Sequence, residues 1–374
     1  MTRTKTALKL RCERDALADA LSTVSRAIST RLRGNPALSC ILLTTDGDEL
    51  HLAATDLDMT IQTLLPIPTG TDGSALVPGR LLAEVVRSLE PGAVDIAADQ
   101  DGVTVSGGRA QFHLRGMDAK DFPVLPEPEG SAVELPVADF AAALRQVVPA
   151  AAHDDTRPIL TGVLLSSEDG EGLTMVATDS YRLARKMLPK LSMLGEGQSV
   201  LVPSRALSEL ERLAVDPDAT LRVFLGSLQV SFTVDRTSLT SRLVEGEYPD
   251  YNRLIPTDPP IRLEVGRQGL VDAIKRARLM ASGPDSPIRM KLAASGAELS
   301  AGDGEGGLAT EQFDATYEGP DMSLGFNPKY LGEALESIGG ESVVFGLTDS
   351  LKPVIIRPSA GEDLVVLVMP VRLS

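Results

Sequence analysis

The stretch VATDSYRLA, residues 176–184, gathers a carboxylate, a hydroxyl, a phenol and a guanidinium within the five residues DSYRL. Such a cluster could serve catalysis or form a binding surface. Dehydrogenases of the Tyr-x-x-x-Lys type use a lysine four residues after the tyrosine, but the residue four after Tyr181 is Arg185, which stays charged and cannot be tuned as a lysine can. These enzymes also need a glycine-rich nucleotide-binding turn between a strand and a helix. The glycine cluster GDGEGG at 302–307 precedes residues that alternate like a strand, so we interpret it as a hairpin loop.

Other residue combinations that could support chemistry are also incomplete. Asp56 and Asp58 are two apart on a predicted strand and so share a face, as a metal-binding or proton-sharing carboxylate pair would. No further oxygen ligand lies nearby in the sequence, which favours a solvated strand or an aspartate bonded to its own backbone. Ser180 has no histidine close in sequence, and GRLLAEV and SRALSEL lack the G-K-[S/T] of a phosphate-binding loop. The three histidines are far apart, at His51, His113 and His153. We therefore predict no catalytic centre, no metal site and no cofactor.

Length and composition limit the class of protein. The chain has 374 residues, more than one hydrophobic core usually supports, and its 43% hydrophobic and 24% charged content is ordinary for a globular protein. It contains no run of 18 apolar residues and no apolar segment near its N-terminus, so we expect an untargeted, cytoplasmic protein. Cys12 and Cys40 lie in apolar runs and are predicted to be buried free thiols. The net charge of −16 opposes nucleic-acid binding unless basic residues gather on one surface.

Three segments of the chain share one pattern, in which a short apolar strand leads to a loop residue and then to a helix with leucines and alanines three and four apart. They are ALVPGRLLAEVVRSLEPG (75–92), VLVPSRALSELERLAVDP (200–217) and LGFNPKYLGEALESIGG (324–340). The loop residues Pro78, Pro203 and Asn327 are separated by 125 and then 124 positions. AATDLDMTI (53–61) and VATDSYRLA (176–184) repeat at a similar spacing of 123 positions. A period of this length indicates a repeated domain and not a solenoid.

Further features mark where each repeat begins and ends. Aromatic–proline pairs, Phe122–Pro123 and Tyr248–Pro249, close the first two repeats, and proline-rich joints follow at 125–131 and 256–261. Each repeat opens with an amphipathic helix, at 15–21, 139–147 and 269–277. We predict three domains, at residues 1–128, 129–257 and 258–374. Hairpin turn signals between runs of Val, Leu and Ile give an α+β fold, with two helices packed against antiparallel sheets in each domain.

Together, the three repeats and the sequence motifs of this chain resemble the bacterial sliding clamp family, the β subunits of the replicative DNA polymerase. The resemblance spans essentially the whole chain, in the order ATDSYRLA, LVPSRALSEL, GEYPDYNRLIP, GFNPKYL, FGLTDSLKP and the ending VMPVRL. It implies a non-catalytic protein that forms a head-to-tail homodimer, a closed ring with helices on its inner wall and sheets outside. Such a ring encircles duplex DNA without reading its sequence. It tethers the replicative polymerase, the clamp loader and repair proteins, and it needs no membrane.

The resemblance also implies which basic residues face DNA. Arg157 matches a basic position in a loop of the second domain, and Arg31 and Arg33 lie in the loop STRLRGN. Pro158 and Ile159 stand where aromatic contacts occur in relatives, so we do not expect this loop to stack on DNA. Acidic residues on the same helices should keep the wall only weakly attractive. The helix residues expected to face DNA are Arg80, Arg87, Arg145, Arg205, Arg212, Lys275, Arg276 and Arg278.

In the family, the ATDxxRLA motif belongs to an apolar pocket for partner peptides that carry a glutamine followed by leucines and a phenylalanine. Leu183, Leu254 and Val371 would supply apolar surface, and the flexible side chain of Met369 would adapt to different partner peptides. The arginines would pack the aliphatic parts of their side chains against the pocket while their charged groups stay in solvent. The alternative is that these apolar residues are ordinary strand core. The matched positions are Leu160, Thr178, Ser180, Tyr181, Arg182, Leu183, Pro249, Arg253, Leu254, Asn327, Tyr330, Leu351, Pro353, Leu367, Val368, Met369, Pro370, Val371, Arg372 and Leu373.

For the dimer contact, the resemblance points to Phe112 and Leu114 on a predicted edge strand, meeting Leu279 and Met280 after the first helix of domain three. Placement in the core is the alternative for these four residues. Two other functions remain open: a clamp paralogue that acts mainly as a peptide-binding scaffold or inhibitor-resistance copy, and an enzyme built on repeated domains. Because AATDLDMTI keeps the ATD of VATDSYRLA but not its Tyr and Arg, we predict that ATD serves the fold and YRL serves binding.

Overall fold

The computed structural model describes residues 8–29, 34–99, 102–154, 156–281, 283, 286–302, 307–361 and 363–373. These residues form two compact units. The first unit comprises residues 1–138 and 209–243, and the second comprises 139–208 and 244–374. Each unit therefore combines one terminal repeat with part of the central repeat, and two of the three points of division fall within helices, α3 (Val137–Val147) and α4 (Ser204–Leu213).

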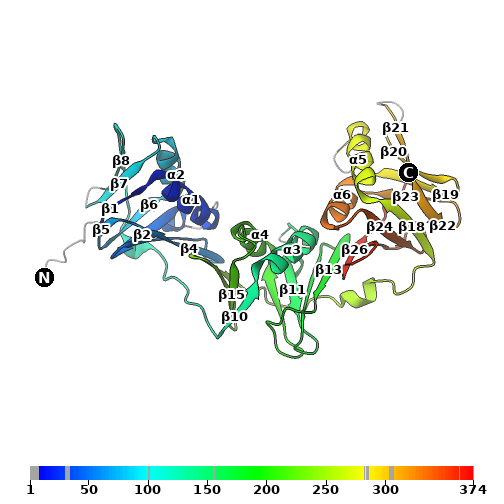
Figure 1. The fold of residues 1–374 in the computed structure, drawn as a ribbon, viewed down its shortest axis with the longest axis horizontal. Coiled ribbons are helices and arrows are strands. Elements are labelled where there is room, and N and C mark those ends of the chain that lie inside the picture. Colours follow the sequence, from blue (N-terminus) through cyan, green and yellow to red (C-terminus); the bar gives the residue numbers. More distant parts are fainter. Residues whose placement is uncertain are drawn as a thin grey trace. The chain divides into compact units, whose positions relative to one another are not determined.

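Each repeat is built from two halves, and each half has the order strand, helix and further strands (Figure 1). The first half of repeat one contains β1 (Leu8–Glu13), α1 (Arg14–Val24), β2 (Cys40–Asp46), β3 (Glu49–Thr55) and β4 (Met59–Pro66). After the short β5 (Thr69–Thr71), the second half contains β6 (Gly73–Pro78), α2 (Gly79–Ser88), β7 (Ala93–Ala98), β8 (Val103–Gly107) and β9 (Ala110–Leu114).

Repeats two and three follow the same order. Repeat two contains β10 (Ala132–Pro136), α3 (Val137–Val147), β11 (Gly162–Ser166), β12 (Leu173–Thr178), β13 (Arg182–Leu188), β14 (Ser199–Pro203), α4, β15 (Thr220–Leu225), β16 (Gln229–Val234) and β17 (Thr237–Arg242). Repeat three contains β18 (Ile261–Gly266), α5 (Arg267–Ala277), β19 (Ile288–Ala293), β20 (Gly296–Ala301), β21 (Ala309–Phe313), β22 (Ala315–Glu318), β23 (Met322–Phe326), α6 (Pro328–Ser337), β24 (Ser342–Leu347), β25 (Val354–Pro358) and β26 (Leu364–Val368). The predicted α+β class, with two helices and antiparallel strands in each repeat, is confirmed.

Two of the sheets continue from one repeat into the next. The eight-stranded sheet has the order β10-β15-β16-β17-β4-β3-β2-β6, and the nine-stranded sheet has the order β14-β11-β12-β13-β26-β25-β24-β18-β22. Strand β17 pairs antiparallel with β4, from Thr237 opposite Thr63 to Ser241 opposite Met59. Strand β13 pairs in the same way with β26, from Arg182 opposite Val368 to Lys186 opposite Leu364. Two smaller sheets, β5-β1-β7-β8-β9 and β21-β20-β19-β23, stay within repeats one and three.

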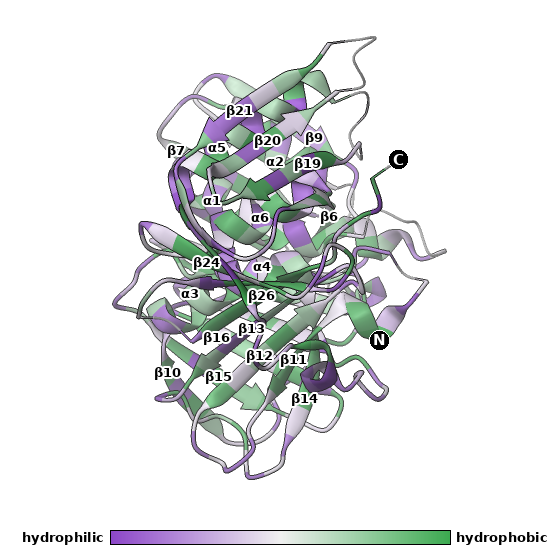
Figure 2. Cartoon of the chain, turned by 90° about the vertical axis from the view of Figure 1, so that its right-hand side faces the viewer, coloured by the Kyte–Doolittle hydropathy of each residue, from purple (hydrophilic) through white to green (hydrophobic). Residues whose placement is uncertain are grey.

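Alternating side chains explain how helices and sheets share a core. In β1 the apolar side chains Leu8, Leu10 and Cys12 are buried, whereas the charged residues between them are exposed. In α2 the buried side chains are Leu82, Ala83, Val85 and Val86, so the helix presents its arginines on the opposite face. Strand β26, which is buried on both faces, consists only of leucine and valine (Figure 2).

Both thiols behave as predicted from their apolar surroundings. Cys12 and Cys40 are free and buried. Burial raises the pKa of the Cys12 thiol to about 12, with smaller contributions from Glu13 and Asp95, so this thiol stays protonated at neutral pH. For the predicted hairpin loop at 302–307, residues 303–306 lie outside the described residues, but β20 and β21 pair antiparallel on either side of them. No helix in the described parts of the chain is long and apolar enough to cross a membrane.

The ATD motif forms the same turn in repeats one and two. Asp56 and Asp58 are not on a strand, as the sequence suggested, but lie in the turn that connects β3 and β4. The Oδ1 atom of Asp56 accepts hydrogen bonds from the backbone N–H groups of Asp58, at 3.1 Å, and Met59, at 2.8 Å. The alternative interpretation of a backbone-bonded aspartate is therefore correct for Asp56. The residue after it, Leu57, has a positive φ of 78°.

The second copy of the turn, residues 179–182, matches the first atom for atom. Asp179 Oδ1 accepts from the N–H groups of Tyr181 and Arg182, both at 2.9 Å, and Ser180 has a φ of 77°. The hydroxyl of Thr178 donates to the carbonyl of Arg182 at 2.6 Å, as Thr55 donates to Met59 at 3.1 Å. The prediction that ATD serves the fold is confirmed, because its side chains satisfy the backbone of the turn.

We predict that Asp56→Ala lowers the free energy of unfolding by about 1–3 kcal/mol, because two backbone donors, of Asp58 and the buried Met59, lose the buried carboxylate that accepts from them. Asp56→Asn keeps an oxygen at the same position and should cost less than half as much. Urea denaturation followed by circular dichroism measures both variants. Equal losses for the two variants would show that these hydrogen bonds contribute nothing.

Candidate functional site

The predicted peptide-binding residues gather around the junction between β13 and β26. The turn 179–182 leads into β13, and the chain leaves β26 at Val368 to form the C-terminal segment 369–373. The N–H of Met369 donates to the carbonyl of Tyr181 at 2.8 Å. The N–H of Val371 donates to the carbonyl of Gly325 in β23 at 2.9 Å. The C-terminal segment is therefore attached to repeat two at one point and to repeat three at another.

An apolar cluster packs around the residues of β12, β13 and β26 at this junction. Val176, Leu183 and Leu367 form its buried centre. The partly buried residues packed against that centre are Leu164, Tyr248, Tyr251, Ile255 and Met369. Burial raises the pKa values of the Tyr248 and Tyr251 phenols, so both are neutral and act here as packing groups, not as acids or bases near neutral pH.

The matched residues divide into a buried layer and an accessible layer. Six are buried within the chain and can support a ligand but offer it little surface: Leu160, Thr178, Arg182, Leu183, Leu367 and Val368. The accessible members lie on the turn, on the 3₁₀ helix η6 (Tyr251–Leu254) and just before it, at the start of α6, in the loop before β25 and along the C-terminal segment. They are Ser180, Tyr181, Pro249, Arg253, Leu254, Tyr330, Leu351, Pro353, Met369, Pro370, Val371, Arg372 and Leu373, and we call them the binding surface. Exposed apolar side chains gathered in this way are typical of an interaction site.

Arg182 departs from the expectation that the arginines keep their charged groups in solvent. Its side chain is only 5% exposed. Its Nε donates to Asp179 Oδ2 at 3.0 Å, and its Nη1 donates to Glu333 of α6. Its guanidinium carbon lies 4.5 Å from the centre of the Tyr330 ring. The sequence could not show this arrangement because Glu333, 151 positions away, carries no motif signal of its own.

Asn327 has a local role at the start of α6. Its side-chain oxygen accepts from the N–H of Lys329 at 2.9 Å and of Tyr330 at 3.3 Å, and Pro328 occupies the first turn. The cap fixes where α6 begins and hence where Tyr330 stands. Tyr330 also lies 6.4 Å from Tyr181, ring centre to ring centre, with the rings inclined by 24°.

Arg157 lies next to the binding surface, although the resemblance grouped it with the DNA-facing residues. Its Nη1 donates to Ser180 Oγ at 2.7 Å and its Nη2 donates to the carbonyl of Asp179 at 3.3 Å. This exposed side chain therefore contacts the turn 179–182, and its role in facing DNA stays a prediction.

The other basic residues are exposed, and several are paired with acids. Arg212 contacts Glu209 at 2.8 Å, Lys275 contacts Glu336 at 2.9 Å, and Arg276 Nη2 contacts a carboxylate oxygen of Glu311 at 2.6 Å. Such pairs weaken the attraction of a surface for phosphate. The other helix residues expected to face DNA, Arg80, Arg87, Arg145, Arg205 and Arg278, are also exposed. Arg31 and Arg33 lie outside the described residues.

The four predicted dimer-contact residues are not equally available. Leu279 is 78% exposed and Met280 is also exposed, both in the 3₁₀ helix η7 (Arg278–Met280) after α5. Phe112 is partly buried on β9, an edge strand. Leu114 is only 5% exposed, so it belongs to the core of repeat one and can add little to a contact.

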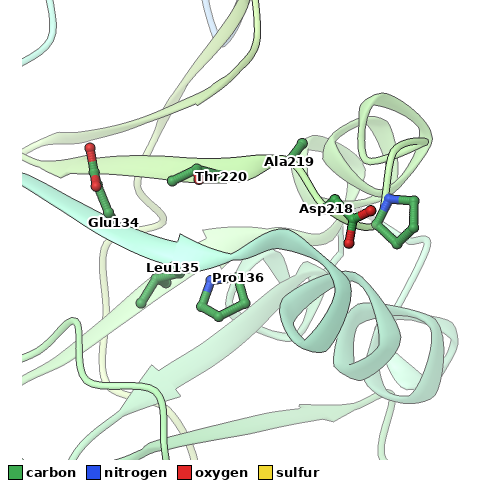
Figure 3. Close-up of a pocket in the computed structure, with 7 residues that line it drawn as sticks. Glu134, Leu135, Pro136, Asp218, Ala219 and Thr220 are labelled. Carbon is green, nitrogen blue, oxygen red and sulfur yellow. The ribbon is translucent and has the colours of Figure 1, made fainter.

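A pocket of about 440 Å³ lies elsewhere, between β10 and the loop that precedes β15 (Figure 3). Glu134 and Asp218 stand at its opposite ends, with Leu135 and Pro136 between them (Figure 3). No group of three or more histidine, cysteine or acidic side chains is positioned to hold a metal within the described ranges. The pocket has no combination of groups that would support catalysis, and it contains none of the matched residues.

Family comparisons agree with this architecture along the whole chain. The models for the DNA polymerase III beta subunit match residues 8–126 for the N-terminal domain, 134–250 for the central domain and 252–372 for the C-terminal domain.

Individual relatives match over nearly their full length. The beta sliding clamp of Streptomyces coelicolor is 32% identical over 98% of this chain and 100% of its own, and that of Synechocystis is 33% identical over the same shares. The crystal structure of the Pseudomonas aeruginosa sliding clamp bound to griselimycin has a TM-score of 0.90 at 30% identity, covering 98% of this chain and 100% of that chain. The Bacillus subtilis clamp has a TM-score of 0.90 at 29% identity, covering 99% of this chain and 100% of that chain.

Three copies of a two-helix α+β domain, with an apolar surface between the second and third, define a DNA clamp. The chain belongs to the bacterial sliding clamp family, the beta subunits of DNA polymerase III.

We predict that Gly325→Ala displaces the C-terminal segment and lowers the affinity of the binding surface for a peptide about fivefold or more. A Cβ at Gly325 would lie 2.6 Å from the carbonyl oxygen of Val371 and 2.8 Å from Leu373, closer than atoms tolerate. Gly332→Ala is the matched control, because a Cβ at that position of α6 meets open space. Fluorescence anisotropy with a labelled partner peptide measures both. Unchanged affinity in Gly325→Ala would exclude the C-terminal segment from the site.

Proposed function

We propose that the chain forms a head-to-tail dimeric ring around duplex DNA. In this role it holds the replicative polymerase, the clamp loader and repair proteins on DNA through short peptides bound at the binding surface. It works in the cytoplasm and performs no chemistry itself. The observation that carries the proposal is the way in which the repeats join one another.

Both junctions inside the chain follow one rule. The last strand in the first half of a repeat pairs with the last strand in the second half of the next repeat. By this rule β4 pairs with β17, and β13 pairs with β26. The rule leaves over β9, which ends the second half of repeat one, and β21, which corresponds to β4 in the first half of repeat three. The strand after β21, β22, pairs with β18 as the short β5 pairs with β1, so neither β22 nor β5 is counted in the rule. Among the described residues, β9 pairs with β8 and β21 pairs with β20, and each ends its sheet.

A third junction of the same kind, between two chains, would satisfy both free strands. Strand β9 of one chain would pair with β21 of its partner, and the reverse contact would close the ring. The exposed Leu279 and Met280 follow α5, which is attached to β21 through the Arg276–Glu311 ion pair. Phe112, on the free edge of β9, is the apolar residue that would meet them.

The charge pattern is consistent with a ring that is retained by topology. A net charge of −16 and paired basic residues give little phosphate affinity, which a closed ring does not need. Weak, sequence-independent contacts from Arg80, Arg87, Arg145, Arg205 and Arg278 would let the ring slide. No observation favours the alternative of a paralogue without replicative duty.

The binding surface suits an extended peptide with aliphatic and aromatic anchors. Leu254, Val371 and the flexible Met369 offer apolar contact, and the exposed Arg253 and Arg372 can orient a polar or acidic peptide group. The griselimycin complex of the Pseudomonas aeruginosa clamp shows that a relative binds a ligand, and here the proposal assigns peptide ligands to this surface.

We predict a solution mass of twice the chain mass of 39.6 kDa at micromolar concentration, measured by multi-angle light scattering. Leu279→Asp should weaken the dimer about 100-fold or more, because a charge would be buried in an apolar contact. Leu254→Asp, an equally drastic change on the binding surface, should leave the dimer intact and weaken peptide binding. A wild-type protein that stays near the mass of one chain would refute the ring.

Topological retention gives a second test. Protein loaded on nicked circular DNA should remain bound in 0.5 M salt, on the order of the concentration at which electrostatic contacts are screened. It should dissociate at least about tenfold faster once a restriction enzyme linearises the DNA. Leu279→Asp should be lost from both forms equally. Equal retention of the wild type on circular and linear DNA would indicate ordinary electrostatic binding.

A further inference from the structure

Arg182 is buried beneath the binding surface and carries an unusual set of contacts. Its guanidinium is held between the carboxylate of Asp179 in its own turn and that of Glu333 on α6. Removing a charge from water is unfavourable unless it is paired in this way. Because Asp179 belongs to repeat two and Glu333 to repeat three, Arg182 links the two repeats at the point where the binding surface lies.

The same guanidinium also supports two aromatic rings. It lies 4.5 Å from the centre of the Tyr330 ring, within the range of a cation–π contact. Tyr330 in turn stacks with Tyr181, whose side chain is 58% exposed. A chain of direct contacts therefore runs from Glu333 through Arg182 and Tyr330 to an aromatic ring that faces solvent.

The first repeat junction provides an internal comparison. Met59 occupies the position of Arg182 in the equivalent turn, and that turn keeps the same hydrogen bonds without an arginine. The buried charge is therefore not required for the fold of the turn. The buried charge of Arg182 occurs only in the turn at the second junction, between β13 and β26, where the binding surface lies.

The glutamate, by contrast, occurs at both junctions. Glu209 and Glu333 are 124 positions apart, the same spacing as Pro203 and Asn327, so they are equivalent in α4 and α6. Glu209 pairs with Arg26 of repeat one at 3.6 Å. At the position equivalent to Tyr330, however, α4 has the buried Ala206. Only at the second junction, therefore, is the ion pair of this glutamate in contact with a pair of aromatic rings.

We propose that Glu333 is a positioning residue for peptide recognition, an inference that rests on the proposed function of the binding surface. Through Arg182, Glu333 fixes Tyr330 and Tyr181 in one arrangement, against which an aliphatic or aromatic side chain of the peptide packs. The fixed arrangement raises affinity because the rings lose less freedom when the peptide binds. Glu333 thus sets the selectivity for peptides with such an anchor without being their main contact.

The test measures binding of a labelled synthetic peptide that carries a glutamine followed by leucines and a phenylalanine, in full-length protein. Glu333→Gln should weaken binding about tenfold. Glu209→Gln, which removes the ion pairs of the equivalent glutamate with Arg26 and Arg212, should change binding less than twofold. In a Tyr181→Ala background the effect of Glu333→Gln should shrink to less than twofold, because the aromatic pair through which it acts is gone.

Near-ultraviolet circular dichroism gives a readout that loss of stability alone would not produce. The chain has no tryptophan and five tyrosines, so the near-ultraviolet signal reports mainly on the tyrosine rings. Glu333→Gln should change this signal at temperatures far below melting, and Glu209→Gln should not. If Glu333→Gln melts well below Glu209→Gln, the binding measurements in the wild-type and Tyr181→Ala backgrounds are made with Glu333→Asp instead. This variant keeps the negative charge on a shorter side chain, and the same results are expected of it.

The outcomes separate the two proposals. Failure of the wild type to bind the peptide at all would overturn the proposed function. Wild-type binding with equal losses in Glu333→Gln and Glu209→Gln, or a loss that is undiminished in the Tyr181→Ala background, would overturn only the positioning role of Glu333.

Discussion

Antiparallel pairing between strands of neighbouring repeats is the interaction on which the rest of the structure depends. Strands β4 and β17, and β13 and β26, each contribute five paired positions, so the backbone hydrogen bonds of a sheet continue from one repeat to the next. A repeat alone would leave these edges unpaired, which sheet proteins avoid. The pairing also brings the end of the chain beside the turn 179–182, and the binding surface exists only because the two meet.

The turn 179–182 illustrates how one local structure serves both fold and function. In repeat one the same hydrogen bonds hold Leu57, Asp58 and Met59, whereas in repeat two they hold Ser180, Tyr181 and Arg182. The threonine and aspartate satisfy the backbone, so the three residues that follow them can change without loss of the turn. Three substitutions within a conserved frame thereby convert a structural turn into part of a binding surface.

The sequence predicted those features that depend on neighbouring residues or on repetition. The α+β class, the helix at the start of each repeat and the burial of Cys12 and Cys40 follow from hydrophobic periodicity and apolar context. The placement of Asp56 and Asp58 on a strand was wrong, because the alternation of charged residues did not reveal that Asp56 bonds its own backbone.

The charged groups of the candidate site were harder to predict. Arg182 was expected in solvent, yet its partner Glu333 is distant in sequence and only the pairing of β13 with β26 brings their repeats together. Arg157 is grouped by resemblance with DNA contacts, and its hydrogen bonds to Ser180 and Asp179, which no sequence pattern predicted, depend on how the loop before β11 folds back. Pairing partners of this kind are set by tertiary structure, and no local pattern in the sequence indicates them.

The three junctions of the proposed ring differ in one respect that strand pairing alone does not show. Those inside the chain are backed by covalent linkers, at 125–131 and 256–261, so their strands remain at high effective concentration even after separating. The proposed contact between β9 and β21 would have no such tether, and its stability would fall as the protein is diluted. It would therefore be the weakest point of the ring under mechanical strain, and the place where DNA would enter or leave without the chain unfolding.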